Sequence, residues 1–177
     1  RSSTMPSKSS FFSKIFKATF AAVSKCPSSL FVSREIAIDL KIFARLGAKE
    51  LDKDVIFNLH KAEFPESLVI PLKDDDIDEI FSMAKKSLNE LYQAYTNGDN
   101  LVVDLAAAEF AAIYLNNKYD VSPYESVWLD ENGLVRQGAM LEIQDIYAKY
   151  NLKSANWNNM SEDGLSLQLE FMAYLIE

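Results

Sequence analysis

Cysteine and histidine each occur once in this chain of 177 residues. Cys26 has no second cysteine for an intrachain disulfide, and His60 cannot supply a multi-histidine metal site. Zinc fingers, iron–sulfur centres and HExxH hydrolases are therefore excluded. We interpret Cys26 as a packing residue and His60, beside Lys61 at a predicted helix end, as a cation at a helix terminus. The sequence predicts no catalytic residue, no metal ion and no bound cofactor.

Glycine and proline are also scarce, with five of each. The glycines lie too far apart for a Walker A or GxGxxG loop, which excludes these two modes of nucleotide binding. No run of about 18 apolar residues is present to form a membrane-spanning helix. With 49% hydrophobic and 25% charged residues, the chain has the composition of one globular domain.

Basic residues are few relative to acidic ones, so the net charge is −8. Residues 1–26 carry five Lys and Arg and no acid, which leaves −13 for residues 27–177. A field of this sign repels nucleic acid and attracts basic partners. We divide the chain accordingly into a basic N-terminal segment, 1–26, and a domain, 27–177.

Apolar residues recur every three to four positions and strand alternation is nearly absent, so the sequence predicts an all-α fold, a single helical bundle. Ser33 is the expected cap of the second helix, and Gly47 its expected left-handed end. Residues 65–71 are expected to be an extended connector and 116–133 an irregular stretch. The alanine-rich face of 101–115 predicts deep burial. The predicted helices cover about 11–25, 34–46, 51–59, 74–97, 101–115, 140–150 and 165–176.

The predicted helix at 11–25 is basic and amphipathic. Its apolar stripe fits a transit peptide, a membrane-surface anchor or an element packed on the domain. We favour packing on the domain, because four phenylalanines suit a core. Residues 1–4, ahead of Met5, are interpreted as an added remnant. The stripe consists of Phe12, Ile15, Phe16, Phe20 and Val23.

Two further segments stand out by composition. The acidic run from Asp74 to Glu79 lacks the glycine of a calcium loop and is interpreted as carboxylates at a helix N-terminus. The aromatic loop 122–133 fits either an apolar groove with a polar rim or a loop folded over the core, with Asp130–Gly133 as a turn.

The aromatic loop also carries a family resemblance. Residues 123–130, Pro-Tyr-Glu-Ser-Val-Trp-Leu-Asp, resemble the Pro-aromatic-x-Ser-Val-aromatic-Leu segment of the TorD/DmsD/NarJ chaperones. Residues 108–115 look like the family's Asp-aromatic-x-Arg-Leu-Phe-Leu helix. Residues 162–165 and 169–172 look like its Glu-Pro-x-Asp-His block and the helix that follows. The resemblance extends over about 31–177.

The resemblance implies an all-helical cytoplasmic chaperone, not an enzyme. Such a protein binds the twin-arginine leader and the apo-form of a molybdenum-dependent oxidoreductase, assists cofactor insertion and delays export. The runner-up is a helical adaptor for an unrelated amphipathic or basic segment. The implied peptide-binding residues are Phe110, Ile113, Tyr114, Pro123, Tyr124, Ser126, Trp128 and Asp163.

The sequence also departs from the family pattern. Ala112 stands where the family has Arg, and Met160, Ser161 and Gly164 stand at the Glu, Pro and His positions, so Asp163 alone remains of that polar block. Residues 10–20 look like the family's final helix at the other end of the chain. A swapped or rearranged terminal helix is therefore expected, in a monomer or a domain-swapped dimer.

Overall fold

The structure is a computed structural model that describes residues 30–70, 77–116, 118, 120–153 and 161–177. These residues form an all-α fold with seven helices and no strand, apart from one isolated bridge between Tyr124 and Gly164. The all-α prediction is confirmed. The predicted helix at 11–25, Cys26 and Asp74–Asp76 lie outside the described residues.

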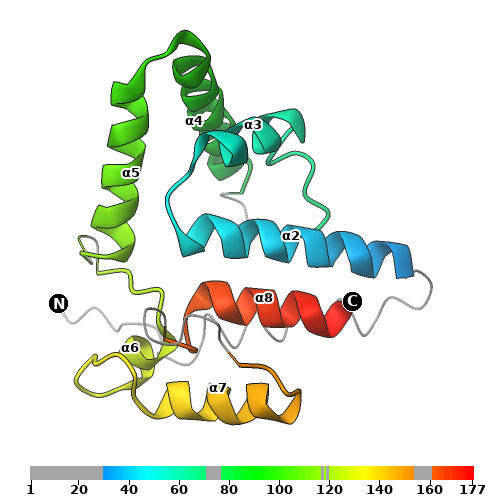
Figure 1. The fold of residues 1–177 in the computed structure, drawn as a ribbon, viewed down its shortest axis with the longest axis vertical. Helices are drawn as coiled ribbons and strands as arrows, with labels where there is room; N and C mark the ends of the chain where they lie inside the picture. Colours follow the sequence, from blue (N-terminus) through cyan, green and yellow to red (C-terminus); the bar gives the residue numbers. More distant parts are fainter. Residues whose placement is uncertain (1–29, 71–76, 117, 119, 154–160) are drawn as a thin grey trace, which may run out of the picture.

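The apolar core forms where α2 (Leu30–Ala48) packs against α8 (Leu165–Ile176), side by side in Figure 1. Its buried members include Leu40, Ala44, Leu169 and Ala173, so small residues alternate with large ones across the contact. Alanines let two helix backbones approach closely. The bounds predicted for α8 are confirmed.

Two sequence expectations for α2 are wrong. α2 begins at Leu30, so Ser33 lies within the helix and is not its N-cap. Gly47 was expected to end the helix. It does not end α2 in the left-handed conformation, because α2 continues to Ala48 and Gly47 has no positive φ. A Cβ atom at Gly47 would lie 2.9 Å from the Ser166 Oγ of α8. The glycine therefore serves the close approach of two helices rather than a turn. By contrast Gly98, with φ 74°, ends α4 as predicted.

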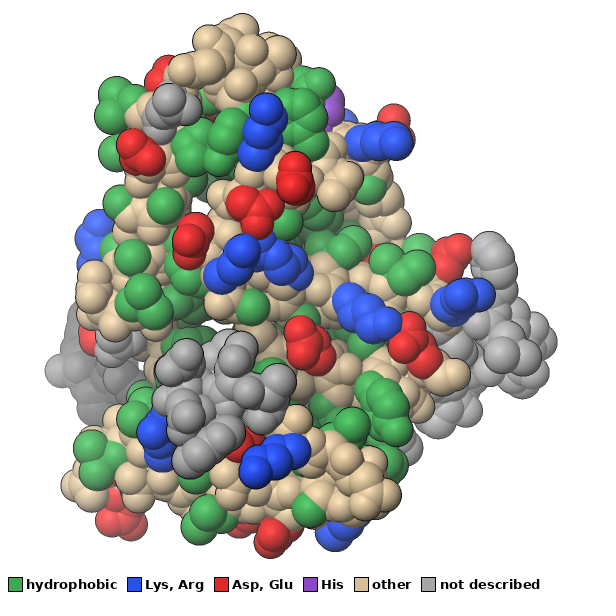
Figure 2. Space-filling view, in the orientation of Figure 1, with side chains coloured by type: hydrophobic (Ala, Val, Ile, Leu, Met, Phe, Trp, Pro, Cys, Tyr) green, Lys and Arg blue, Asp and Glu red, His purple; other side chains and the backbone are tan. Residues whose placement is uncertain are grey.

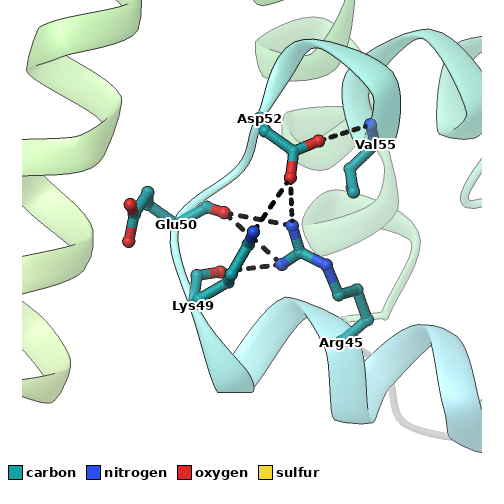
Figure 3. Close-up of polar contacts among 5 residues, drawn as sticks. All are labelled: Arg45, Lys49, Glu50, Asp52 and Val55. Carbon is teal, nitrogen blue, oxygen red and sulfur yellow. Dashed lines mark hydrogen bonds and ion pairs between the residues drawn. The ribbon is translucent and has the colours of Figure 1, made fainter.

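The junction between α2 and α3 (Lys53–Lys61) is held by polar contacts, shown in Figure 3. Asp52 caps α3 by accepting a hydrogen bond from the Val55 amide at 3.0 Å. Arg45 pairs with the same carboxylate at 2.8 Å and donates to the Lys49 carbonyl at 3.0 Å. The Val55 hydrogen bond, aided by Lys49 and Arg45, lowers the pKa of Asp52.

The segment after α3 also differs from expectation. Residues 62–67 form turns, so the predicted extended connector 65–71 is wrong over its first residues. The Leu68 amide donates to the Pro65 carbonyl at 3.1 Å, which closes one of these turns. The chain then returns to α2, where the Val69 and Ile70 amides donate to the buried Asp39 carboxylate at 2.6 and 2.9 Å.

A second cluster joins α3 to α4 (Ile77–Asn97) around Ile56, Leu59 and Leu88. The next helix, α5 (Asn100–Tyr114), packs chiefly on α4, and none of its described residues is buried. Deep burial of α5 was expected, and among the described residues this is wrong: Leu101 and Leu105 are 67% and 57% exposed. No described element covers the stripe of α5 that carries them, and Figure 1 shows the helix standing apart at one side of the fold.

Two further helices complete the described fold. The stretch 116–133, expected to be irregular, contains the one-turn helix α6 (Glu125–Leu129). α6 packs chiefly on α7 (Gly138–Lys149), and Figure 1 shows α7 on the side of α8 away from α2. Gly133, with φ 67°, closes the turn that begins at Asp130, as predicted.

Candidate functional site

The aromatic loop is joined to a turn far along the chain that immediately precedes α8. The Leu165 amide donates to the Pro123 carbonyl at 2.8 Å, and the Glu125 amide donates to the Asp163 carbonyl at 3.1 Å. Between them, Tyr124 and Gly164 form the isolated antiparallel bridge. These backbone contacts fix residues 123–125 against 163–165, which we call the loop clamp.

A fully buried carboxylate lies at the centre of the loop clamp. Asp163 accepts a hydrogen bond from the Ser126 amide at 2.7 Å and another from the Ser161 hydroxyl. α6 has no capping side chain of its own, so Asp163 satisfies an amide of its first turn from a distant part of the chain. Because buried charges require such partners, Asp163 and Ser126 hold the loop in place.

Ser126 extends this network to the next loop. Its Oγ accepts a hydrogen bond from the Arg136 amide at 3.1 Å, and its side chain is only 1% exposed. Both Ser126 and Asp163 were expected to touch a peptide, but the structure places them inside the chain. Their hydrogen-bond partners lie within the chain: backbone amides, the Ser161 hydroxyl and the Gln168 side chain. These contacts position the loop.

The aromatic side chains of the loop are half-buried at its edge. Trp128 donates from Nε1 to the Ser122 carbonyl at 2.9 Å, which leaves the ring fixed across the loop. Tyr124 lies against the backbone of Gly164, where an added Cβ would be 3.5 Å from the ring and 3.1 Å from the Ser161 carbonyl. The contact with the Ser161 carbonyl is the tighter of the two, so a side chain at position 164 would press on the turn that precedes α8.

Glu125 lies beside the clamp with its carboxylate partly buried. The Gln168 side chain of α8 donates to it at 2.9 Å and to the Asp163 carbonyl at 3.0 Å. Burial raises the pKa of Glu125, and the charges of Asp163 and Glu142 raise it further against the effect of Gln168. The loop therefore carries an acidic side chain whose charge is disfavoured by its surroundings.

A buried tyrosine supports the turn from α7. The hydroxyl of Tyr147 donates to the Glu162 carbonyl at 3.3 Å, and its ring lies 4.8 Å from that of Phe171 on α8. Burial, with Glu162 and Asp163 nearby, raises the pKa of Tyr147. Sequence reasoning missed the roles of Tyr147, Ser161 and Gln168, because their partners are backbone carbonyls and side chains distant in sequence.

The expected residues on α5 form a separate group. The rings of Phe110 and Tyr114 lie 4.7 Å apart, and both side chains are half-buried, as is that of Ile113. α5 packs chiefly on α4, whereas α6 packs chiefly on α7. The expected residues on α5 and those of the aromatic loop therefore belong to different helix pairs. Seven residues of chain, 115–121, connect them before Ser122.

The surroundings of both groups are acidic. Residues 101–177 contain twelve Asp and Glu but four Lys and Arg. Figure 2 shows acidic, basic and hydrophobic side chains interspersed over the face presented there. Among the residues that the structure describes, no cluster of three or more His, Cys, Asp or Glu could hold a metal ion.

His60 offers no alternative catalytic site. Its ring stacks on Tyr92, with centroids 3.8 Å apart and planes 5° from parallel. It also borders a pocket of 460 Å³ whose lining includes Glu66 and Lys85, which pair with each other at 2.5 Å. The stacked ring and the ion pair give these groups structural partners, and no Ser or Cys nucleophile lines the pocket.

The geometry thus defines a class: an all-α protein in which a buried carboxylate fastens an aromatic loop to the start of the last described helix. The family model described as "Nitrate reductase delta subunit" matches residues 74–177, more than half of the chain. The chain belongs to this family, and the resemblance to the TorD/NarJ chaperones is confirmed.

Curated relatives agree with the family. The "Chaperone protein TorD" of Vibrio parahaemolyticus is 24% identical over 135 residues, covering 76% of this chain and 60% of the relative. That of Vibrio cholerae strain O395 is 28% identical over 128 residues, covering 72% and 56%. The chain therefore spans 60% or less of the length of these relatives. No solved structure matches it.

The names of these relatives describe chaperones, not enzymes. In the described residues, no helix is both long and apolar enough to cross a membrane.

Proposed function

We propose that this chain is a cytoplasmic maturation chaperone for a molybdenum-dependent oxidoreductase. In this proposal it binds the enzyme's twin-arginine leader and apo-form, assists cofactor insertion and delays export. Family membership supports the general class, and the loop clamp supports the leader-binding role. The observation that carries the proposal is the buried Asp163, which holds a rigid aromatic loop on an acidic protein.

A leader of this kind combines arginines with an apolar stretch, and both have counterparts here. Pro123, Tyr124 and Trp128 provide half-buried apolar area at fixed positions, which lowers the entropy lost on binding. Phe110, Ile113 and Tyr114 provide a second apolar group on α5. The excess of acid attracts the arginines over a distance and speeds their approach. Ser126 and Asp163 act through the loop they hold.

The test is a calorimetric titration of the full chain with a twin-arginine leader from a molybdoenzyme of the same organism. Binding should weaken as salt rises. The substitution Trp128→Ala should weaken it by about 1–3 kcal/mol, the usual range for an aromatic anchor. Met83→Ala is the matched control, because Met83 is 63% exposed on α4, away from the loop.

The outcomes separate the two candidate functions. A scrambled leader with the same composition should bind much more weakly than the native one. If the scrambled peptide binds equally well, the chain is a general adaptor for basic amphipathic segments. If no leader from that organism binds at low salt, the chaperone proposal is wrong.

A further inference from the structure

α8 is apolar on both sides, although α2 covers only one of them. Ser166, Leu169 and Ala173 are buried against α2. Helical spacing places the other apolar residues on the opposite side, which we call the outer face of α8. On this face Tyr174 is 50% and Leu175 44% exposed. The outer face consists of Leu167, Phe171, Tyr174 and Leu175.

Among the described residues, α7 reaches only part of the outer face. The rings of Tyr147 and Tyr150 lie 4.8 and 5.3 Å from Phe171, at the middle of α8. The C-terminal turn, with Tyr174 and Leu175, remains exposed beyond them. An apolar surface of this kind normally packs against a partner.

We propose that the chain's own segment Phe12–Val23 docks on the outer face of α8. The position of α2 makes this possible. α2 and α8 run antiparallel, since Gly47 faces Ser166 and Lys41 pairs with Glu177 at 2.5 Å. By this register Leu30, where α2 begins, lies roughly 10 Å beyond the end of α8. The six residues 24–29 can span about 20 Å, enough for the chain to turn back along α8.

Length and charge complete the match. Phe12–Val23 contains twelve residues, as α8 does, so each would be about 18 Å long as a helix. The segment carries its apolar stripe together with Lys14 and Lys17, and residues 1–26 contain no acid. α8 contains Glu170 and no Lys or Arg. A basic amphipathic helix is therefore complementary to an apolar face with an acidic edge.

The uncovered stripe of α5 is a poorer site for the same segment. Figure 1 shows α5 beside the end of α2 opposite to Leu30. The 19 residues of α2 extend about 28 Å, which exceeds the reach of residues 24–29. This docking does not rest on the proposed leader binding, which involves the aromatic loop at the start of α8, whereas the exposed Tyr174 and Leu175 lie at the end of the helix.

Photocrosslinking of the full chain tests the contact directly. A benzophenone amino acid replaces Leu175 in one variant and Leu141 in the control, since Leu141 is 57% exposed on α7. Equal amounts of isotopically light and heavy protein are mixed before irradiation. We expect crosslinks from position 175 to residues 11–25 of the same chain. Crosslinks to a second copy, to other segments only, or equally from position 141 would overturn the proposal.

Limited trypsin digestion tests the contact with variants in each of the two segments, α8 and Phe12–Val23. Leu175→Glu and, separately, Phe20→Asp should each expose the bonds after Lys14 and Lys17, giving cleavage about tenfold faster than in the wild type. Ala21→Asp makes a similar change on the opposite side of the predicted helix and should leave the rate unchanged. Equal cleavage rates for wild type, Leu175→Glu and Phe20→Asp would refute docking.

Discussion

α5 and α8 are two predominantly apolar helices with different surroundings. α8 buries Ser166, Leu169 and Ala173 against α2, whereas none of the described residues of α5 is buried. Helix formation follows from local signals, which are the alanine content of α5 and the apolar spacing of α8. Burial depends on a partner at the right position, and sequence periodicity does not identify it. Helix formation is therefore predictable from local sequence, whereas burial of a helix is not.

A second difference concerns polarity. The α2–α8 contact is largely apolar, while the loop clamp at the start of α8 is centred on the buried Asp163, whose partners Ser126 and Ser161 are also buried. The apolar contact stabilises through area removed from water, and the clamp fixes the geometry of one loop.

The largest loss of stability is expected at the contact between α8 and α2. Leu169→Ala should lower the free energy of unfolding by about 2–5 kcal/mol, because it leaves a cavity against α2. Leu105→Ala on α5 should change it by less than about 0.5 kcal/mol, since Leu105 is 57% exposed. Urea denaturation measures both. Equal losses would show that α5 is as closely packed as α8.

Removing the central carboxylate should have a somewhat smaller effect. Asp163→Ala leaves the Ser126 amide and Ser161 hydroxyl without their acceptor and should cost about 1.5–3 kcal/mol, the range for hydrogen bonds to charged groups. Asp163→Asn should retain part of this, since an amide oxygen can still accept. Thermal unfolding gives the order wild type, Asn, Ala; a fully stable alanine variant would contradict the clamp.

The smallest effect concerns pH and Glu125. Its folded pKa is raised above the unfolded value of 4.5, chiefly by burial. The folded state therefore binds the proton more strongly, so this group contributes stability that is lost as pH rises through the folded pKa. Glu125→Gln should remove this dependence and be slightly more stable than wild type at pH 7, with a smaller difference at pH 4. A less stable glutamine variant at pH 7 would contradict the sign.

Much of the fold could be predicted from the sequence, because apolar spacing and capping residues are local signals. The bounds of α8 and the role of Gly98 follow from such signals. The role of Gly47 could not be predicted, because the side chain that requires a glycine there is Ser166, on a helix distant in sequence. The same applies to the site: the family motifs identify Ser126 and Asp163, but not that they bond to each other inside the protein.

The most direct measurement of the central claim is amide hydrogen exchange of the full chain with and without a bound twin-arginine leader. Leader binding at the aromatic loop should slow exchange in residues 122–129 and 110–114 and leave exchange in the α2–α8 core unchanged. Protection confined to α2, α3 or α8, with the aromatic loop unaffected, would contradict it.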